Sequence, residues 1–215
     1  MRRTLIAIAA ACLTVPVSAL VAQGDAPQFA LGQPDPALVK AGSYATDPHH
    51  TLVGWRVNHL GFNDYFGIFG DVTGTLDLDP ANLSAAKVDV TIPVASVTTA
   101  SAGLTEHLLR AGKDGGKPDF FGPSPAPARF VSTMVTPTGP MTAQIVGDLT
   151  LNGVTAPVAI NATFTGAGPA PMSNKETVGF EGRALLKRST FGIDMAIPLV
   201  SDEVELDITA AFEKQ

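Results

Sequence analysis

The chain contains a single cysteine, Cys12, among its 215 residues. It lies in an N-terminal segment in which two arginines precede an uncharged apolar run over residues 5–17, a pattern typical of a secretory signal peptide. We expect the signal to span residues 1–22, with cleavage after Ala19 or Ala22. The mature chain then contains no thiol, which excludes disulfides, Cys-ligated metals and thiol catalysis together.

Long apolar runs and basic residues are also scarce. No later run approaches the roughly 20 residues that a membrane-spanning helix needs, so we expect the mature protein not to be embedded in a membrane. Without the two arginines of the signal, 12 Lys and Arg stand against 20 Asp and Glu, a net charge of about −8. Such a surface repels nucleic acid and anionic membrane, so neither is an expected partner.

What the chain does contain is a regular alternation of apolar and polar residues. Residues 23–42 lack it and are rich in Ala, Pro, Gly and Gln, which indicates a flexible tether. From Thr51 onward the alternation predicts strands with one buried and one solvated face, so residues 43–215 are expected to form one all-β domain. Eight strand segments are expected, at residues 53–58, 66–78, 87–94, 129–135, 142–151, 157–164, 178–187 and 203–208.

Three features interrupt the strands. Asn152-Gly153 favours the positive φ angles of a tight hairpin turn between the fifth and sixth segments. Apolar residues one turn apart indicate a short helix near residues 104–110. Residues 111–128 hold four Gly and four Pro and predict a long loop, of a kind that is usually functional or mobile in a compact domain. Its Phe120-Phe121 pair gives this loop an apolar contact.

Eight antiparallel strands with one wet face can bury the other face in a two-sheet sandwich or in a closed barrel. Closure removes the exposed edges that a sandwich must protect. At about eight strands the interior is wide enough to be filled by side chains or to hold one small ligand. We therefore expect an eight-stranded antiparallel barrel with one short helix between strands.

The four histidines are His49, His50, His59 and His107. One interpretation is a metal site formed by the last three histidines and an aspartate. The simpler interpretation is that histidines at strand ends form hydrogen bonds with backbone or water. Because the mature chain has no cysteine and no short His-rich ligand spacing, we expect no metal. The chain lacks a G-x-S-x-G elbow and a glycine-rich phosphate loop. We therefore expect no enzyme activity, no catalytic residue and no cofactor.

Two polar side chains are candidates for ligand contact. Arg188 follows a strand and either pairs with an anionic headgroup at a barrel mouth or forms a surface ion pair with a carboxylate. Trp55, the only tryptophan, lies on the apolar face of its strand. Its side chain belongs to the packed core or to a pocket wall, and in the second case the indole N–H reaches a polar group.

Ten motifs, in order from Tyr44 to the C-terminus, resemble the YceI-like family of lipocalin-like, polyisoprenoid-binding periplasmic proteins. The first five are Tyr44-x-x-Asp47-Pro48-x-His50-Thr51, Trp55-x-Val57-x-His59-Leu60-Gly61, the segment from Gly70 to Leu76 that ends in Gly74-Thr75-Leu76, Ile92-x-Val94-Ala95-Ser96-Val97-x-Thr99 and Glu106-His107-Leu108. The others are Asp119-Phe120-Phe121, Arg129-Phe130-x-Ser132, Gly147-Asp148-Leu149-Thr150-Leu151-x-Gly153-Val154-Thr155-x-Pro157-Val158, Arg188-Ser189-x-Phe191-Gly192 and Ser201-Asp202-Glu203-Val204.

The resemblance implies a lipocalin-like eight-stranded barrel, without catalytic activity, that holds a prenyl chain or another long-chain amphiphile. It suggests a periplasmic carrier or sensor of an isoprenoid-type lipid, a polyprenyl phosphate or a quinone, with a homodimer as a further expectation. The alternatives are a fatty acid or fatty amide as ligand, an enzyme or redox partner acting on a bound lipid, or a structural protein with a filled core. The chain departs from the family at Trp55, at Thr190 and in an insertion at residues 111–117.

We expect the ligand to lie among apolar and aromatic side chains, with Arg188, Asn58 and His59 meeting its phosphate or quinone oxygen at the mouth. The full set of expected ligand-binding residues is Trp55, Val57, Asn58, His59, His107, Phe120, Phe121, Arg188 and Phe191.

Overall fold

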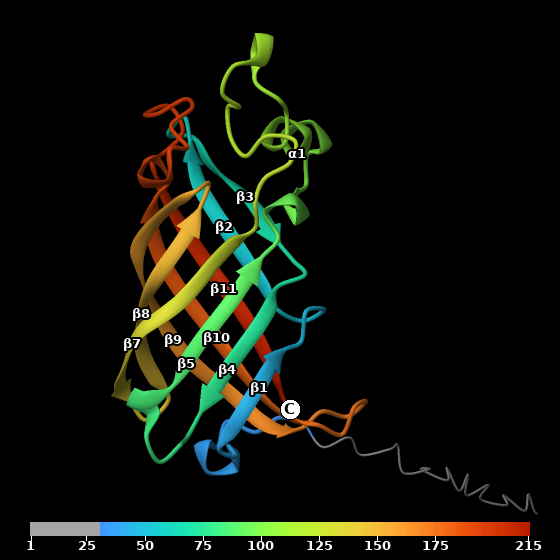
Figure 1. Ribbon diagram of the computed structural model, residues 1–215, viewed down its shortest axis with the longest axis vertical. Helices are drawn as coiled ribbons and strands as arrows, with labels where there is room; N and C mark the ends of the chain where they lie inside the picture. The colour runs from blue at the N-terminus through green and yellow to red at the C-terminus, as the bar shows by residue number, and fades with distance from the viewer. Residues whose placement is uncertain (1–30) are drawn as a thin grey trace, which may run out of the picture.

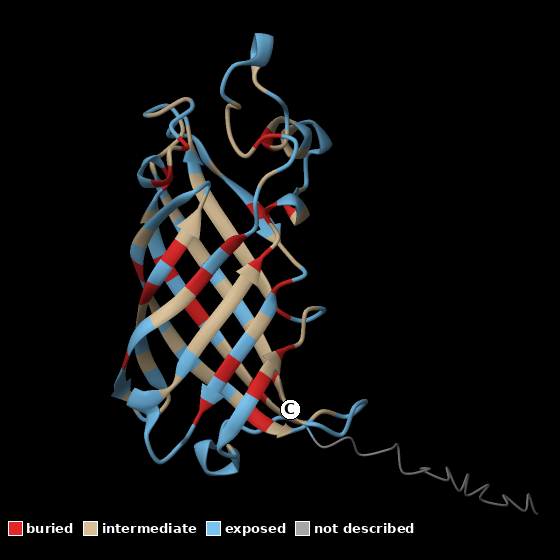
Figure 2. Ribbon diagram, in the orientation of Figure 1, coloured by how far each residue is buried: buried red, intermediate tan, exposed pale blue. Residues whose placement is uncertain are grey.

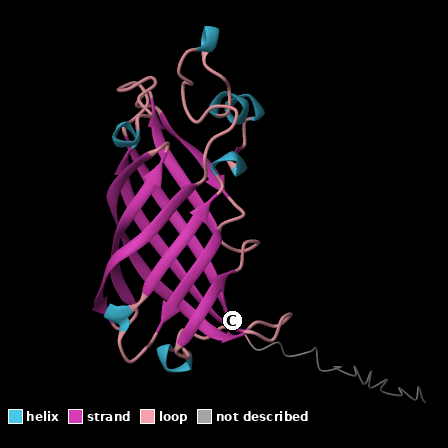
Figure 3. Cartoon of the chain, in the orientation of Figure 1, coloured by secondary structure: helices cyan, strands magenta, loops and turns pink. Residues whose placement is uncertain are grey.

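The computed structural model describes residues 31–215, so the expected signal peptide at residues 1–22 lies outside the described part of the chain. Strands are the main secondary structure of the described chain, with one α-helix and short 3-10 turns near the two ends of the molecule (Figure 3). The strands are β1 (Gly42–Thr46), β2 (Leu52–His59), β3 (Asn63–Phe69), β4 (Thr73–Leu78), β5 (Lys87–Ile92), β6 (Thr98–Thr99), β7 (Ala128–Gly139), β8 (Thr142–Leu151), β9 (Val154–Pro169), β10 (Glu176–Lys187) and β11 (Glu203–Lys214). The helices are α1 (Ala102–Leu108) and the 3-10 turns η1 (Pro36–Leu38), η2 (Leu83–Ala85), η3 (Val94–Ser96), η4 (Lys113–Gly115) and η5 (Arg188–Phe191).

The strands form one antiparallel sheet that closes on itself (Figure 1). Strand β11 pairs with β10 along one edge, and along its other edge with β2 and then with β1. Because β1 also pairs with β4, the sheet has no free edge at this seam. The expected eight-stranded antiparallel barrel is therefore confirmed, and the sandwich is excluded.

Three of the eight wall strands are bent, which is why eleven strands form an eight-stranded barrel. The first is divided into β1 and β2, the second into β3 and β4, and the third into β5 and β6. Ser96 joins the bends of the second and third: its Oγ accepts from Gly70 N at 3.1 Å and donates to Gly70 O at 3.0 Å. The expected third segment accordingly ends at Ile92, because the chain turns into η3 after Pro93.

The other sequence expectations fit in part: β1 lies before the first expected segment, and β10 begins two residues earlier than expected. Strand β8 has the expected bounds, and Asn152 (φ 52°) and Gly153 (φ 78°) form the hairpin turn to β9 with positive φ angles. Strands β7, β9 and β11 are longer than their alternation indicated. Exposed residues alternate with buried or half-buried ones along the wall, as a one-sided strand requires (Figure 2).

The described part of the expected tether, residues 31–42, lies against the barrel. Gln33 and Ala167 exchange two backbone hydrogen bonds of 2.9 Å, and Lys40 pairs with Glu176 on β10. Val39 packs on the apolar cluster beneath. Composition alone did not reveal these contacts because they involve the distant strands β9 and β10.

One end of the barrel holds a cluster of buried side chains. It lies at the bottom of Figure 1, near the C-terminus. We call this cluster the closed end; Tyr44 at its centre has no exposed surface and donates from its hydroxyl to the carbonyl of Lys40. Phe180 stacks edge-on with Phe164 and Phe212, at ring separations of 5.8 and 6.3 Å. The buried members of the closed end are Tyr44, Leu76, Leu78, Ala167, Val178 and Phe212.

Candidate functional site

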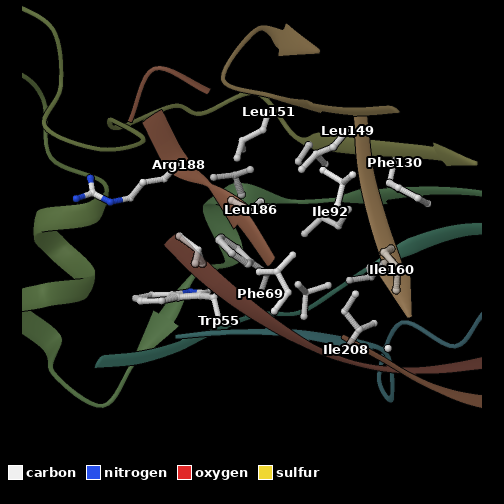
Figure 4. A pocket seen from close by; sticks show the side chains of 18 of the residues that line it. Trp55, Phe69, Ile92, Phe130, Leu149, Leu151, Ile160, Leu186, Arg188 and Ile208 are labelled. Atoms are coloured by element: carbon white, nitrogen blue, oxygen red, sulfur yellow. The ribbon is translucent and has the colours of Figure 1, made fainter. Parts of the chain in front are cut away.

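Above the closed end the barrel surrounds a cavity of about 510 Å³. Protein cores rarely contain voids larger than a water molecule, whereas pockets for small organic ligands measure about 300–1,000 Å³. The closed end forms its floor through Leu76, Phe180 and Phe212. Inward side chains of the wall strands line the rest, among them Phe69, Ile92, Phe130, Leu149, Leu151, Ile160, Leu186 and Ile208 (Figure 4).

The upper end of the cavity is bounded partly by loops and by α1. We call it the mouth and define it by His59, His107, Phe120, Met195 and Val200, all of which line the cavity. Met195 is 41% exposed, so the cavity reaches the molecular surface there.

Helix α1 and the loop that follows it, residues 109–127, lie over one side of the mouth, and we call them the cover. The helix begins at the N-cap Ser101, whose Oγ accepts from Leu104 N at 3.3 Å. The loop folds back so that Phe121 N donates to Leu108 O at 3.0 Å, and the Phe121 ring packs edge-on against Phe69 at 5.9 Å. The expected apolar contact of Phe120 and Phe121 is thus present, and both rings line the cavity.

A small ionic cluster fastens this cover. His107 Nε2 lies 2.8 Å from Asp119 Oδ2, and Arg110 Nη2 lies 2.9 Å from the same oxygen. His107 also stacks edge-on with Phe120 at 5.2 Å. Hydrogen bonds from His107 and then Arg110 hold the pKa of Asp119 below its usual value. The polar side of His107 is therefore occupied by Asp119.

Trp55 lines the cavity from β2, with its indole over the neighbouring strand β3. Gly67, its partner residue, makes this possible: a Cβ at that position would lie 2.2 Å from Trp55 Cζ2. Among the buried side-chain nitrogen and oxygen atoms of residues 31–215, Trp55 Nε1 alone has no hydrogen-bond partner. The N–H expected to reach a polar group thus reaches none in the described residues: Nε1 is enclosed by protein atoms over Gly67, where a Cβ would lie 2.7 Å from it, although buried donors are nearly always paired.

Arg188 reaches the same end of the cavity, but its guanidinium points away from the apolar side chains (Figure 4). It donates to the carbonyl oxygens of Ile193, Val200 and Ser201 at 3.0, 2.9 and 2.9 Å, and it is only 6% exposed. Burial lowers the pKa of Arg188, and the nearby carboxylates of Asp202 and Asp194 oppose this shift. Within residues 31–215 Arg188 forms no ion pair with a carboxylate, and three of its five N–H donors bond loop carbonyls.

Most of the other expected ligand-binding residues are brought together. Trp55, Val57, His59, His107, Phe120, Phe121 and Arg188 all line the cavity. Asn58 does not: its side chain donates to Asp64 Oδ1 at 3.2 Å and accepts from Gly61 N at 2.9 Å, outside the barrel. Phe191 does not either, because it is buried in the wall, 1% exposed, behind the mouth loop.

Sequence reasoning also missed some lining residues. The wall positions could have been found from the alternation alone, whereas Tyr65 and Met195 carry no such signal.

The three histidines considered for a metal site are separated: His50 pairs with Asp47, His107 with Asp119, and His59 ends β2. Within residues 31–215 no group of three or more His, Cys, Asp or Glu side chains is arranged to hold a metal ion. The same residues include no helix with the length and apolarity to cross a membrane.

Known proteins share this architecture. The YceI-like domain model matches residues 44–212. The chain belongs to the YceI-like family. A UPF0312 protein of Pseudomonas aeruginosa is 43% identical over 169 residues, which cover 77% of this chain and 84% of the relative. A UPF0312 protein of Ectopseudomonas mendocina is 41% identical over 169 residues, with the same coverage of 77% and 84%.

Solved structures of the YceI-like fold agree. A YCEI protein of Campylobacter jejuni superposes with a TM-score of 0.61 at 28% identity, covering 74% of this chain and 90% of the other. BcnA of Burkholderia cenocepacia gives 0.63 at 24% identity, with 75% and 95% covered. A polyisoprenoid-binding domain from Saccharophagus degradans gives 0.54 at 13% identity, with 82% and 100% covered. At 24% and 13% identity, the last two likenesses show a shared fold.

Proposed function

We propose that this chain is an exported, periplasmic carrier or sensor of an isoprenoid-type lipid, whose chain lies in the barrel cavity. The observation that carries the proposal is the apolar cavity of about 510 Å³ between the closed end and the mouth. Each buried CH₂ group gains about 0.8 kcal/mol, so a prenyl chain binds such walls without specific polar contacts. The N-terminal segment, with its two arginines and apolar run, supports export.

The cavity favours an uncharged headgroup, such as that of a quinone, over a phosphate. Most of the residues that line it are apolar, and Trp55 Nε1 is enclosed by protein atoms. Arg188, the cation that would bind a phosphate, is already bonded to three backbone carbonyls. A buried phosphate without a paired cation is strongly disfavoured. A fatty amide is uncharged as well and is therefore the second candidate ligand.

The direct test is native mass spectrometry of the purified protein, followed by organic extraction and identification of what it holds. We expect an isoprenoid quinone or a related uncharged lipid, and a rise in melting temperature when such a quinone is added. A polyprenyl phosphate in the extract would refute the headgroup assignment. Absence of any lipid, together with an unchanged melting temperature, would refute the proposed carrier function.

A pair of ligands tests Trp55 itself. Trp55→Phe keeps an aromatic ring but removes the N–H and part of the ring surface that lines the cavity. Because Nε1 is enclosed by protein atoms, affinity for an isoprenoid quinone and affinity for squalene, an isoprenoid hydrocarbon without oxygen, should fall equally, roughly twofold to tenfold. A loss for the quinone alone would mean that the indole turns and donates to a quinone oxygen.

A further inference from the structure

Apolar side chains gather on the outside of the molecule beside the mouth. They come from the turn between β2 and β3 and from the loop that precedes β11, which lie together at the top of Figure 1. Phe62 is 87% exposed and Leu199 is 63% exposed. Large apolar side chains this accessible, clustered rather than scattered, mark interaction sites. We call this surface the rim and define it as Leu60, Phe62, Met195 and Leu199.

The rim is held in place by hydrogen bonds between its two segments. Leu60 N donates to Leu199 O at 2.7 Å, and Ser201 N donates to Asn58 O at 2.9 Å. Asn58 N in turn donates to Ser201 Oγ at 2.9 Å. Arg188 fastens the loop from below through the three carbonyls described above. Asn58 and Arg188 therefore hold the two rim segments together.

Each rim segment has an apolar residue in a backbone conformation that other residue types usually adopt. Leu60 (φ 58°) and Ala196 (φ 61°) both adopt the left-handed conformation, one in each rim segment. Residues with a Cβ pay for this conformation, and Asn, Asp and Gly are the usual occupants. The turn thus presents a leucine at a position where a polar residue would be better suited to both the backbone and water.

The rim is continuous with the cavity. Along β2 and its turn, His59 lines the cavity and the next residue, Leu60, belongs to the rim. In the opposite loop Val200 lines the cavity and Leu199 belongs to the rim, while Met195 does both. An apolar chain that leaves the cavity at the mouth therefore passes directly onto the rim.

We propose that the rim dips into the surface of a lipid bilayer and brings the mouth against it, so that lipid passes between bilayer and cavity. This inference rests on the proposed function, because a lipid cargo must come from a lipid phase. Four apolar side chains at one end of a barrel are too few for a stable protein interface, which needs roughly 20–30 residues a side. Shallow insertion into the interfacial region of a bilayer is favoured by small apolar faces of this kind.

Charge decides which bilayer surface suits the rim. The carboxylates of Asp64 and Asp194 flank it, and their basic partners Arg56 and Lys117 offset them at 3.9 and 3.2 Å. The chain as a whole is acidic, with a formal net charge of −6. Attraction to anionic lipid is therefore absent, and the rim should bind a zwitterionic surface at least as well as an anionic one.

The experiment compares a rim variant with a matched control on vesicles of phosphatidylcholine. The rim variant is Phe62→Ser with Leu199→Ser, neither of which lines the cavity. The control is Met172→Ser with Leu185→Ser, which removes two exposed apolar side chains away from the rim, 93% and 56% exposed. Sedimentation with vesicles measures binding to the bilayer, and transfer of an isoprenoid quinone from vesicles to protein measures delivery.

We expect the rim variant to bind vesicles about tenfold more weakly, as loss of two apolar side chains from an interface predicts, and the control to match the parent. Quinone transfer should slow in parallel, while quinone affinity in detergent stays unchanged. Equal vesicle binding by parent and rim variant would overturn the proposal. So would a parent dimer that the rim variant converts to a monomer, because the rim would then be a protein interface.

The experiments distinguish failure of the proposed carrier function from failure of the proposed contact between rim and bilayer. Sedimentation uses vesicles without quinone, so it reports on the rim even if the protein holds no lipid. A parent that binds vesicles through the rim but takes up no quinone refutes only the proposed cargo. A parent that binds quinone in detergent but ignores vesicles refutes only the rim.

Discussion

At the closed end of the barrel Tyr44, Val178 and Phe212 pack with almost no exposed surface, whereas at the mouth the same sheet encloses empty space. Both ends are built from strands with the same alternation of apolar and polar residues. They differ in whether the inward side chains fill the interior. The closed end contributes stability and the hollow end contributes room, so the same substitution should cost more stability at the closed end than at the cavity wall.

The largest effect is expected at the closed end. Phe212→Ala removes a ring that is 5% exposed and leaves a void, which should lower the free energy of unfolding by about 3–5 kcal/mol. Urea denaturation measures this. The control, Phe66→Ala on the outer face of β3, removes a ring that is 61% exposed and should cost less than about 1 kcal/mol. Similar losses for the two variants would mean that the closed end is not the stabilising part of the barrel.

The next effect concerns the loop that frames the mouth. Arg188→Met deprives three carbonyls of their donors, and we expect a loss of roughly 2–3 kcal/mol, because a buried acceptor left unpaired costs about 1–3 kcal/mol. Arg183→Met, on the exposed face of β10, is the matched control and should have little effect. If Arg188 bound the headgroup instead, its replacement would abolish the ligand-induced rise in melting temperature and leave the unliganded stability intact.

A pair of identical substitutions on β9 compares the two ends most directly. Ala167→Leu adds bulk to the closed end, where Ala167 is 2% exposed, and overpacking there should cost about 1–3 kcal/mol. Ala162→Leu adds the same bulk to the cavity wall, where there is room, and should cost less than about 1 kcal/mol. It should also reduce the lipid content found by extraction. Equal costs would show that the cavity collapses in solution.

The smallest effect is a pH dependence of the cover over the mouth. His107 and Arg110 lower the pKa of Asp119, so the contact is fully present above the usual Asp value of about 3.9 and is lost as the pH falls through the lower folded value. Hydrogen exchange of α1 should therefore rise in acid beyond its intrinsic change. Asp119→Asn should raise it about twofold to fivefold at neutral pH and remove the acid dependence.

The neighbouring Asp114→Asn serves as the control for that measurement. Asp114 lies in the same loop and is exposed, and its left-handed backbone (φ 51°) suits Asn equally well. It should leave the exchange of α1 unchanged at every pH. A change equal to that of Asp119→Asn would mean that net loop charge, and not the contact with His107, controls the cover.

Much of the wall could be predicted from the sequence because strand alternation is a local property. Val204, Leu206 and Ile208 face the interior as expected, and each lines the cavity. The bounds of β8 and the turn at Asn152-Gly153 could also be predicted from the sequence, since both depend on adjacent residues. The ionic partner of His107, by contrast, comes from a loop twelve residues away, where no periodicity indicates contact.

By itself the sequence determined that this protein is a family member with a one-sided β wall and an apolar interior. Only the tertiary structure decided that the interior is filled at one end and hollow at the other, because the fit between opposite walls depends on residues far apart in the chain. It also decided the role of Arg188, whose partners at Ile193, Val200 and Ser201 are backbone carbonyls that residue types do not reveal. For the same reason the rim became visible only when two distant segments lay side by side at the mouth.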